Sequence, residues 1–268
     1  MPLLSAATLR ALPALGLFLA LGNCAAPPPG QDFYDPFEAS NRQVHEFNRS
    51  LDGLAIRPAG LSTSALEPGS FDWVVNFSDN ASLPGIILNN MLQLDGEAAA
   101  TNTMRFVINT TMGLGGIVDW ASDFGLYEQD SDFGATLAHY GVNEGAYLEL
   151  PLIGPSTQRD AVGEVVDLLL DPLDEVGTLT QRRYSLPAKA GEIVVERGAY
   201  GDTIDSVLVD SADSYAQTRL IYLQNRRFEL GQAAGAGGSA GASAVDPYAV
   251  DPYAADPYAA NADEELSR

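Results

Sequence analysis

The body of the chain, residues 32–229, carries apolar side chains every three or four positions, which is the spacing of amphipathic helices. Almost no stretch alternates at every second position, as a half-buried strand would. Asp35-Pro36 predicts the first helix start, because aspartate caps helix N-termini and proline suits the first helical position. One face of this helix carries Phe37, Val44, Phe47 and Leu51, and a second stripe carries Asn41, His45, Asn48 and Asp52.

Further helices are predicted along the rest of the body. They cover residues 71–77, 86–94, 97–110, 157–170, about 187–209 and 211–229. Leu83-Pro84 interrupts the pattern between the first two, since proline breaks helical hydrogen bonding. Thr157 and Asp160 resemble a capping box at a helix start, and Asp171-Pro172 ends that helix.

The predicted helix over 86–94 has an unusually broad apolar face. Its polar residues are mainly amides, and no charged residue occurs between Asp79 and Asp95. Such a segment is a buried core helix in a soluble protein. On a membrane-anchored protein it can instead lie at the bilayer interface with its apolar side toward lipid. Both interpretations stay open.

Composition narrows the function classes. The chain has 268 residues and a formal net charge of −22, with 36 acidic and 14 basic residues, so its surface repels nucleic acids. A single cysteine excludes an internal disulfide framework and thiolate-rich metal sites. The two histidines, His45 and His139, have no zinc-ligand spacing. We therefore expect no metal, no cofactor and no nucleic acid partner.

The lone cysteine ends an apolar leader. Arg10 precedes an apolar stretch over 11–21 that is too short to span a bilayer, and Leu21-Gly22-Asn23-Cys24 resembles the bacterial lipobox. Asn23 departs from the small residue usual at its position, and an unmodified thiol is the alternative. The sequence predicts a lipoprotein signal peptide over 1–23, covalent acyl chains on Cys24 and a tether over 24–34.

The carboxyl-terminal segment differs in composition from the body. Residues 230–268 are rich in Gly, Ala and Ser and contain an Asp-Pro-Tyr-Ala unit three times at a five-residue period. Such a repeat buries little apolar surface, so we expect a disordered acidic tail. A role as a peptide ligand is the alternative.

No reaction centre emerges from the motifs. The nucleophile-elbow pattern at residues 237–241 lies in the low-complexity tail, and Gly113–Gly116 lacks the third glycine of a dinucleotide loop. A Ser-His-Asp site on His139 remains open, because such triads are defined by geometry rather than by sequence order. The expectation is that the chain has no catalytic residues and is not an enzyme.

A family resemblance rests on a set of short motifs that follow one another between Asp35 and Phe228. They are Asp35-Pro36-Phe37-Glu38, Asn41-Arg42, Phe47-Asn48, Arg57-Pro58, the runs 105–110, 113–119 and 133–142, then Gly145, Leu150-Pro151, Gly154-Pro155 and Arg159-Asp160, and late in the chain Asp213, Tyr215, Arg219, Tyr222, Gln224 and Arg226. Together they resemble the MlaA family, also called VacJ, of outer-membrane lipoproteins. The tail lies outside the resemblance.

The resemblance implies an all-α fold over 35–229, a ring-like helical domain with interfacial helices around an amphipathic channel. It implies a lipid-anchored protein on the periplasmic side of the outer membrane, in its inner leaflet, bound to a trimeric porin. Its function would be to remove mislocalised phospholipids from the outer leaflet and pass them to a periplasmic shuttle protein. This retrograde transport maintains lipid asymmetry. A lipoprotein esterase or phospholipase, and a structural porin-associated lipoprotein, are the alternatives.

Two sets of site residues follow from this interpretation. The channel and gate candidates, which a tight turn between helices also explains, are Gly113, Gly115, Gly116, Ile117, Val118 and Trp120. Three glycines permit close backbone approach and a hinge. The candidates for guiding a phosphate headgroup are Arg57, Arg105, Arg159 and Arg219. Structural ion pairs between helices are the alternative for these arginines.

Overall fold

The computed structural model describes residues 33–67, 69–170 and 179–231. The predicted signal peptide, Cys24 and the Asp-Pro-Tyr repeats lie outside these residues. The chain divides into two units, Met1–Tyr222 and Leu223–Arg268. In the second unit, the end of the last helix has a local hydrogen bond in which Asn225 Nδ2 donates to Glu229 Oε1 at 2.5 Å.

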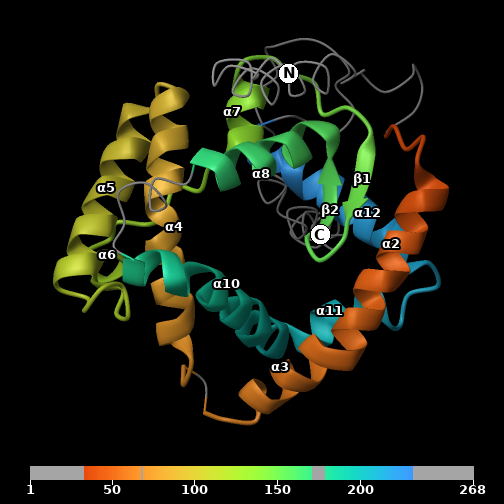
Figure 1. Ribbon diagram of the computed structural model, residues 1–268, viewed down its shortest axis with the longest axis horizontal. Coiled ribbons are helices and arrows are strands. Elements are labelled where there is room, and N and C mark those ends of the chain that lie inside the picture. Colours follow the sequence, from red (N-terminus) through yellow and green to blue (C-terminus); the bar gives the residue numbers. More distant parts are fainter. Residues whose placement is uncertain (1–32, 68, 171–178, 232–268) are drawn as a thin grey trace, which may run out of the picture. The chain divides into compact units, whose positions relative to one another are not determined.

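The described residues are mostly helical, as predicted (Figure 1). In chain order the elements are α2 (Glu38–Leu51), the π-helix η1 (Asp52–Ile56), α3 (Arg57–Ser64), α4 (Asp72–Leu92), α5 (Gly96–Thr111), α6 (Trp120–Asp123), α7 (Phe133–His139), β1 (Tyr147–Leu150), β2 (Gly154–Thr157), α8 (Gln158–Leu170), α10 (Leu179–Ala199), α11 (Gly201–Leu208) and α12 (Ser214–Glu229).

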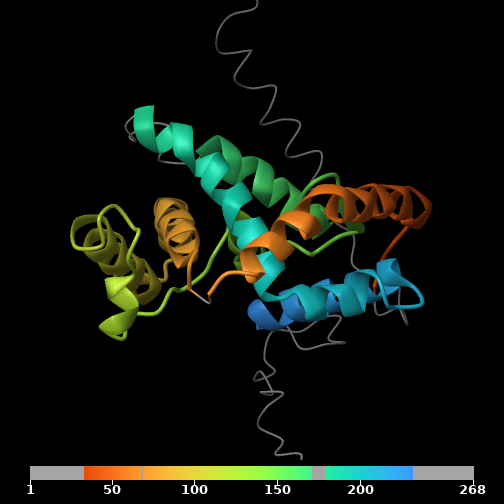
Figure 2. The same ribbon diagram turned by 90° about the horizontal axis from the view of Figure 1, so that it is seen from below.

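Helix pairs that are distant in sequence pack side by side. α4 lies along α5, and α10 contacts both α3 and α4 (Figure 2). α7 packs on α8 (Figure 1). The α3–α10 crossing is close, because a Cβ at Gly198 would lie 2.4 Å from the carbonyl oxygen of Gly60. Glycine at both positions lets the two backbones touch, so the sequence fixes where these helices cross.

The first helix does not begin as predicted. α2 starts at Glu38 with Phe37 as its N-cap residue, and no side chain caps it. Asp35 instead accepts hydrogen bonds from Asn41 Nδ2 at 3.0 Å and Tyr215 Oη at 2.5 Å, and it pairs with Arg219. Three donors, one of them charged, stabilise the carboxylate more than a local cap does. This binding fixes the start of the described chain on α12.

Other elements also differ from the prediction. α10 begins at Leu179 rather than near residue 187, and α3, α6 and α7 lie where the sequence predicts no helix. α4 is one continuous helix, with Pro84 inside it, because packing against α5 and α10 offsets the one backbone bond that proline removes. The predicted helix over 187–209 is two helices, α10 and α11, which meet at Tyr200. Arg197 Nη1 donates to the Gly201 carbonyl at 3.3 Å, which stabilises this break.

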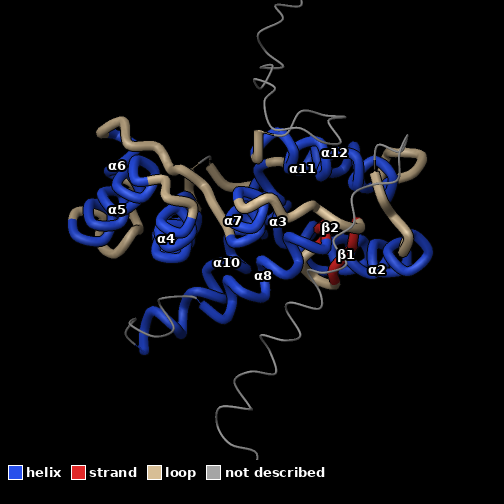
Figure 3. Tube along the Cα trace, turned by 90° about the horizontal axis from the view of Figure 1, so that it is seen from above, coloured by secondary structure: helices blue, strands red, loops and turns tan. Residues whose placement is uncertain are grey.

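A β-hairpin is present that the pattern did not predict (Figure 3). β1 and β2 pair antiparallel, with Tyr147 opposite Thr157 and Leu150 opposite Gly154. Asn41 of α2 donates to the Tyr147 carbonyl and accepts from the Glu149 amide, at 3.0 and 3.1 Å. This side-chain amide satisfies the outer edge of β1, so a strand of only four residues is stable beside a helix.

Burial is inverted on several helices. In α2, Asn41 and His45 are buried while Phe37 and Phe47 are exposed, which is the reverse of a soluble amphipathic helix. In α4, the amides Asn89 and Asn90 are buried along with Ile86 and Leu83, whereas Met91 and Leu92 are exposed. No helix within residues 33–67, 69–170 and 179–231 combines the length and the apolar composition needed to cross a bilayer.

Candidate functional site

Helix α5 supplies the framework of the site. Its first turn is capped by Asp95, whose carboxylate accepts from the Ala98 amide at 2.9 Å. Asn102, Arg105 and Asn109 follow at spacings of three and four residues, so they form one stripe along the helix. All three are buried beneath the segment 113–130. Polar side chains buried in this way must find hydrogen-bond partners, and that requirement determines the local structure.

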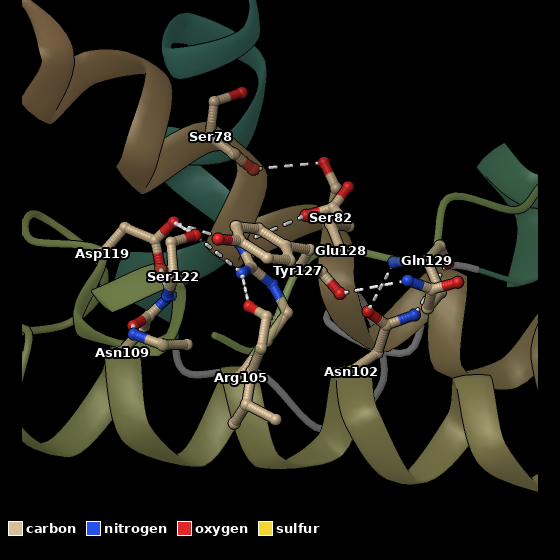
Figure 4. Close-up of polar contacts among 12 residues, drawn as sticks. Ser78, Ser82, Asn102, Arg105, Asn109, Asp119, Ser122, Tyr127, Glu128 and Gln129 are labelled. Carbon is tan, nitrogen blue, oxygen red and sulfur yellow. Dashed lines mark hydrogen bonds and ion pairs between the residues drawn. The ribbon is translucent and has the colours of Figure 1, made fainter. Parts of the chain in front are cut away.

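Arg105 is the centre of these contacts (Figure 4). Its Nη1 donates to Ser122 Oγ at 3.0 Å and to the Leu126 carbonyl at 2.5 Å. Its Nη2 lies 3.2 Å from Asp119 Oδ2 and 3.9 Å from Glu128 Oε2. The guanidinium therefore holds the segment 119–128 against α5.

Asp119 is the main anionic partner in this cluster. Its carboxylate accepts from Asn109 Nδ2 at 2.8 Å and from Ser122 Oγ at 2.5 Å, and it caps α6 through the Ser122 amide. Burial alone raises the pKa of Asp119, but the hydrogen bonds from Ser122 and Asn109, together with the Arg105 charge, lower it below its ordinary value. Asp119 is thus ionised at neutral pH and binds Arg105 tightly.

Two other carboxyl groups have pKa values that are raised rather than lowered. Burial raises the pKa of Glu128 to about 7, and the negative charges of Asp79, Asp130 and Asp119 add to the effect, while Arg105 opposes it. Burial also raises the pKa of Asp79 to about 6, aided by Glu192. Protonation of this side of the cluster therefore changes near neutral pH.

The gate candidates form one tight turn after α5. Gly115 and Gly116 have φ values of +82° and +100°, which favour glycine. The Gly116 amide donates to the Asn109 carbonyl at 2.9 Å, and the Val118 amide donates to the Gly113 carbonyl at 3.0 Å. The turn is thus closed on itself and on the end of α5. This is the tight turn that the sequence left open as an alternative, and the gate role stays a prediction.

Two asparagines of α4 hold this turn from the other side. Asn76 Nδ2 donates to the Ile117 carbonyl at 3.2 Å, and Asn80 Nδ2 donates to the Gly115 carbonyl at 3.4 Å and to Thr110 Oγ1 at 3.2 Å. A Cβ at Gly116 would lie 2.5 Å from the Cβ of Asn80, whereas a Cβ at Gly115 would meet nothing within 4 Å. The two glycines therefore differ in what limits their replacement.

The apolar candidates of the turn point outward. Ile117, Val118 and Trp120 are each about two-fifths exposed, and Leu114 between the glycines is 74% exposed. Leu114 also has a φ of +57°, which is unfavourable for a residue with a Cβ. Leu114, Ile117, Val118 and Trp120 thus give the turn an exposed apolar surface.

The remaining arginine candidates have separate partners. Arg57 Nη2 lies 2.6 Å from Asp205 Oδ2, and Arg159 Nε lies 3.0 Å from Asp160 Oδ1. Arg219 pairs with Asp35 and stacks 4.0 Å above the Phe33 ring. All four arginines thus make ion pairs, but the Arg159–Asp160 pair lies within α8 and joins no two helices. A headgroup contact stays a prediction for each.

The sequence did not predict a buried polar trio formed by His45, Ser214 and Glu149. His45 Nε2 lies 3.0 Å from Ser214 Oγ, His45 Nδ1 lies 3.3 Å from Glu149 Oε1, and Tyr147 Oη donates to Glu149 at 2.5 Å. The only sequence signal was the place of His45 on a polar stripe. His45, Ser214 and Glu149 are all more than nine-tenths buried, so the trio connects α2 to β1 and α12 as an internal bridge.

Within the part of the chain that the structure describes, no group of three or more His, Cys, Asp or Glu side chains is arranged to hold a metal ion. His139, the histidine of the esterase alternative, makes an edge contact with the Tyr140 ring at 5.2 Å. The described site is therefore a polar cluster covered by an apolar, glycine-rich turn.

Comparison with known proteins adds an independent finding. Residues 33–229 match the family model of the MlaA lipoprotein. A protein of Rickettsia bellii is 35% identical over 198 residues, which cover 73% of this chain and 76% of that protein. The intermembrane phospholipid transport system lipoprotein MlaA of Escherichia coli is 31% identical over 224 residues, covering 80% and 86%.

A solved structure shows the same fold. It concerns the structural basis for maintenance of bacterial outer membrane lipid asymmetry, and it superposes with a TM-score of 0.61 at 28% sequence identity. The match covers 73% of this chain and 98% of the solved chain. Sequence and structure comparisons therefore point to one group of proteins.

Proposed function

Because this chain belongs to the MlaA lipoprotein family, we propose that it removes mislocalised phospholipids from the outer leaflet of the outer membrane. It passes them to a periplasmic shuttle protein for retrograde transport, which maintains lipid asymmetry. Relatives named for intermembrane phospholipid transport, and a solved structure concerned with lipid asymmetry, support this function. Phospholipid is the cargo.

The structural observation that supports this proposal is the burial pattern of α5, in which polar side chains are buried and apolar ones are exposed. Its outer face exposes Met104, Val107 and, just beyond the helix, Met112, while its polar stripe is buried. Between Glu97 and Asp119 the only charged residue is Arg105, and Arg105 is buried. An exposed unpaired charge costs several kcal/mol in hydrocarbon, so a surface without charges suits contact with acyl chains. The proposal places this face against the inner leaflet.

A polar interior suits the other end of a phospholipid. An ionised headgroup needs hydrogen-bonding partners wherever it leaves water. The buried amides of α4 and α5 and the Arg105 cluster are the kind of wall that such a route requires. We assign the amphipathic channel of the family to this helical domain, and the turn at 113–120 to its wall and gate.

The anchor and partners complete the proposal. Acyl chains on Cys24 hold the protein at the outer membrane, and two or three chains are needed for stable binding. Phe33 is the ninth residue after Cys24, so the start of the described body stays within about 30 Å of the anchor. A trimeric porin is the membrane partner. The strongly acidic chain suits a basic surface on the shuttle.

Deletion of the gene tests the function directly. Phospholipid in the outer leaflet should rise in the deletion strain, return to normal with the unchanged gene, and stay high with Cys24→Ala. The measurement is outer-leaflet phospholipid labelling on intact cells, with expression of each variant checked by immunoblot. Normal asymmetry in the deletion strain would overturn the proposal.

The alternatives predict different results with purified protein. Since the proposed function needs no catalytic step, the protein should not hydrolyse a fluorogenic phospholipid, and it should co-purify with intact phospholipid. Turnover that His139→Ala abolishes would support an esterase instead. Absence of bound phospholipid, together with an unchanged porin complex, would support a purely structural lipoprotein.

A further inference from the structure

A polar pocket lies away from the Arg105 cluster, where α3 meets the end of α10 and the start of α11. Its volume is about 410 Å³. Arg57 and Arg197 contribute guanidinium groups to the wall, and Asp202 and Asp205 contribute carboxylates. Leu61 and Tyr200, each 62% exposed, also line it. The pocket thus combines both signs of charge with apolar groups.

Arg57 has hydrogen-bonding capacity to spare in this wall. It follows η1 directly, and π-helical turns occur often at functional sites. Its Nη2 is bound to Asp205, but its Nε is buried and has no hydrogen-bond partner. The Arg57 side chain as a whole is 41% exposed, so an acceptor in the pocket can reach the guanidinium through its exposed atoms.

The start of α11 adds backbone donors to the same pocket. Its N-cap residue, Tyr200, supplies no side-chain cap, and the first backbone bond within the helix comes from the Ile204 amide to the Tyr200 carbonyl at 3.0 Å. The amides of Gly201, Asp202 and Thr203 precede that bond and belong to residues that line the pocket. Amides at the start of a helix favour a phosphate.

The charge balance decides between a simple anion and a zwitterion. Arg197 is bound to both Asp52 and Asp205, and Arg57 also binds Asp205, so these four charges offset one another. Asp202, in the first turn of α11, adds a further negative charge to the wall. A bare phosphate meets repulsion from Asp202, whereas a phosphate that carries an ammonium group does not.

We propose that this pocket binds a zwitterionic phosphoethanolamine headgroup, with the phosphate on Arg57 and the amides of α11 and the ammonium on Asp202. Leu61 and Tyr200 then contact the glycerol and the first methylenes. The identification of the ligand as a lipid rests on the proposed function, while the charge complementarity rests on the pocket alone. The pocket is a specificity site in addition to the channel route.

Soluble headgroups test this inference on the full-length protein in detergent micelles. Calorimetric titration would use glycerophosphoethanolamine, glycerophosphoglycerol and inorganic phosphate. Glycerophosphoethanolamine should bind about tenfold more tightly than the other two, because only its ammonium pairs with Asp202. Equal or tighter binding of inorganic phosphate would identify a free-phosphate site and overturn the lipid assignment.

Two variants separate the roles of the walls. Arg57→Gln should weaken glycerophosphoethanolamine about tenfold. Asp202→Asn should tighten inorganic phosphate about threefold and abolish the preference for the zwitterion. Arg49→Gln, at a partly exposed position, and Asp210→Asn, at an exposed one, make the same charge changes outside the pocket and should alter neither affinity. A preference that survives Asp202→Asn would overturn the inference.

Folding and transport readouts keep the result interpretable. Asp202 is exposed, so Asp202→Asn remains an interpretable variant even if Arg57→Gln fails to fold. Thermal unfolding of each variant checks this. If outer-leaflet phospholipid rises in the deletion strain but no headgroup binds in vitro, the assignment of a headgroup to this pocket is wrong and the proposed function stands. Headgroup binding with normal asymmetry in the deletion strain would do the reverse.

Discussion

Glu128 is a residue whose environment disfavours its charged form. It lies near Asp79 and Asp119, with Arg105 as its nearest cation at 3.9 Å, and its pKa is raised to about 7. The folded state therefore binds the proton more tightly than the unfolded state, in which the pKa is near 4.5. Stability from this group is complete below pH 4.5 and is lost as the pH rises through 7.

Glu128→Gln should remove this loss. The variant should be more stable than the unchanged protein at pH 8, by about 1 kcal/mol, and the difference should disappear near pH 5. Denaturant unfolding at both pH values measures it. Asp123→Asn, on the exposed side of α6, removes one negative charge without this environment and should show no such dependence. A pH-independent gain in Glu128→Gln would contradict the account.

Gly115 is the cleanest residue at which to test the gate. A side chain there meets nothing within 4 Å, so Gly115→Leu costs only the positive φ, about 1 kcal/mol. We expect this variant to fold and to raise outer-leaflet phospholipid toward the level of the deletion strain. Gly125→Leu is the matched control, because Gly125 also has a positive φ of +78° and open space around its Cβ position. This variant should transport normally. Normal asymmetry in a folded Gly115→Leu strain would count against the gate.

At the scale of elements, periodicity predicts helices well and their buried faces poorly. The predicted helix over 97–110 corresponds to α5, and the Thr157–Asp160 start of α8 is present, with Thr157 Oγ1 bonded to Asp160 at 2.8 Å. Hydropathy assumes that apolar faces turn inward. Asn102 and Asn109 turn inward instead, and only their distant partners explain why.

The features that the sequence predicted wrongly or not at all also depend on contacts between residues far apart in the chain. Asp35 loses its cap role to Tyr215 and Arg219, which are about 180 residues away. The β-hairpin depends on Asn41 of α2 at its edge. Sequence motifs predicted two parts of the site, the glycine turn and Arg105. They did not predict Glu128 or Asp79, because the raised pKa values of these residues arise from burial next to other elements. Tertiary contacts of this kind leave no periodic signal.

The α3–α10 crossing yields a prediction about an element pair. Gly198→Ala places a methyl group 2.4 Å from both the Gly60 carbonyl oxygen and Thr63 Oγ1, so the helices must separate. We expect a loss of about 2–3 kcal/mol in the free energy of unfolding, measured with denaturant. Gly85→Ala, inside α4 with open space, should gain roughly 0.5–1 kcal/mol through helix propensity. Equal effects of the two variants would show that the crossing is not tightly packed.

At the scale of the whole molecule, the proposed function gives the protein two contacts with the membrane. One is the proposed acyl anchor at Cys24, and the other is the outer face of α5 after Glu97 with the turn that follows it. In this proposal the anchor limits how far the body can move away from the bilayer, and the apolar face determines which side it presents. If so, the face should bind lipid even without the anchor, and its binding can be measured separately.

A chain that begins at residue 25, and so has no acyl group, should float with phospholipid vesicles. Met104→Gln with Val107→Gln should weaken this binding by roughly 2 kcal/mol, about thirtyfold, because each half-exposed side chain no longer gains from burial in lipid. Val165→Gln with Leu168→Gln makes a matched change on the exposed side of α8 and should have little effect. Equal loss from both pairs would mean that lipid contacts the body without preference for α5. Retained flotation of the α5 pair would place the membrane-facing surface elsewhere on the chain.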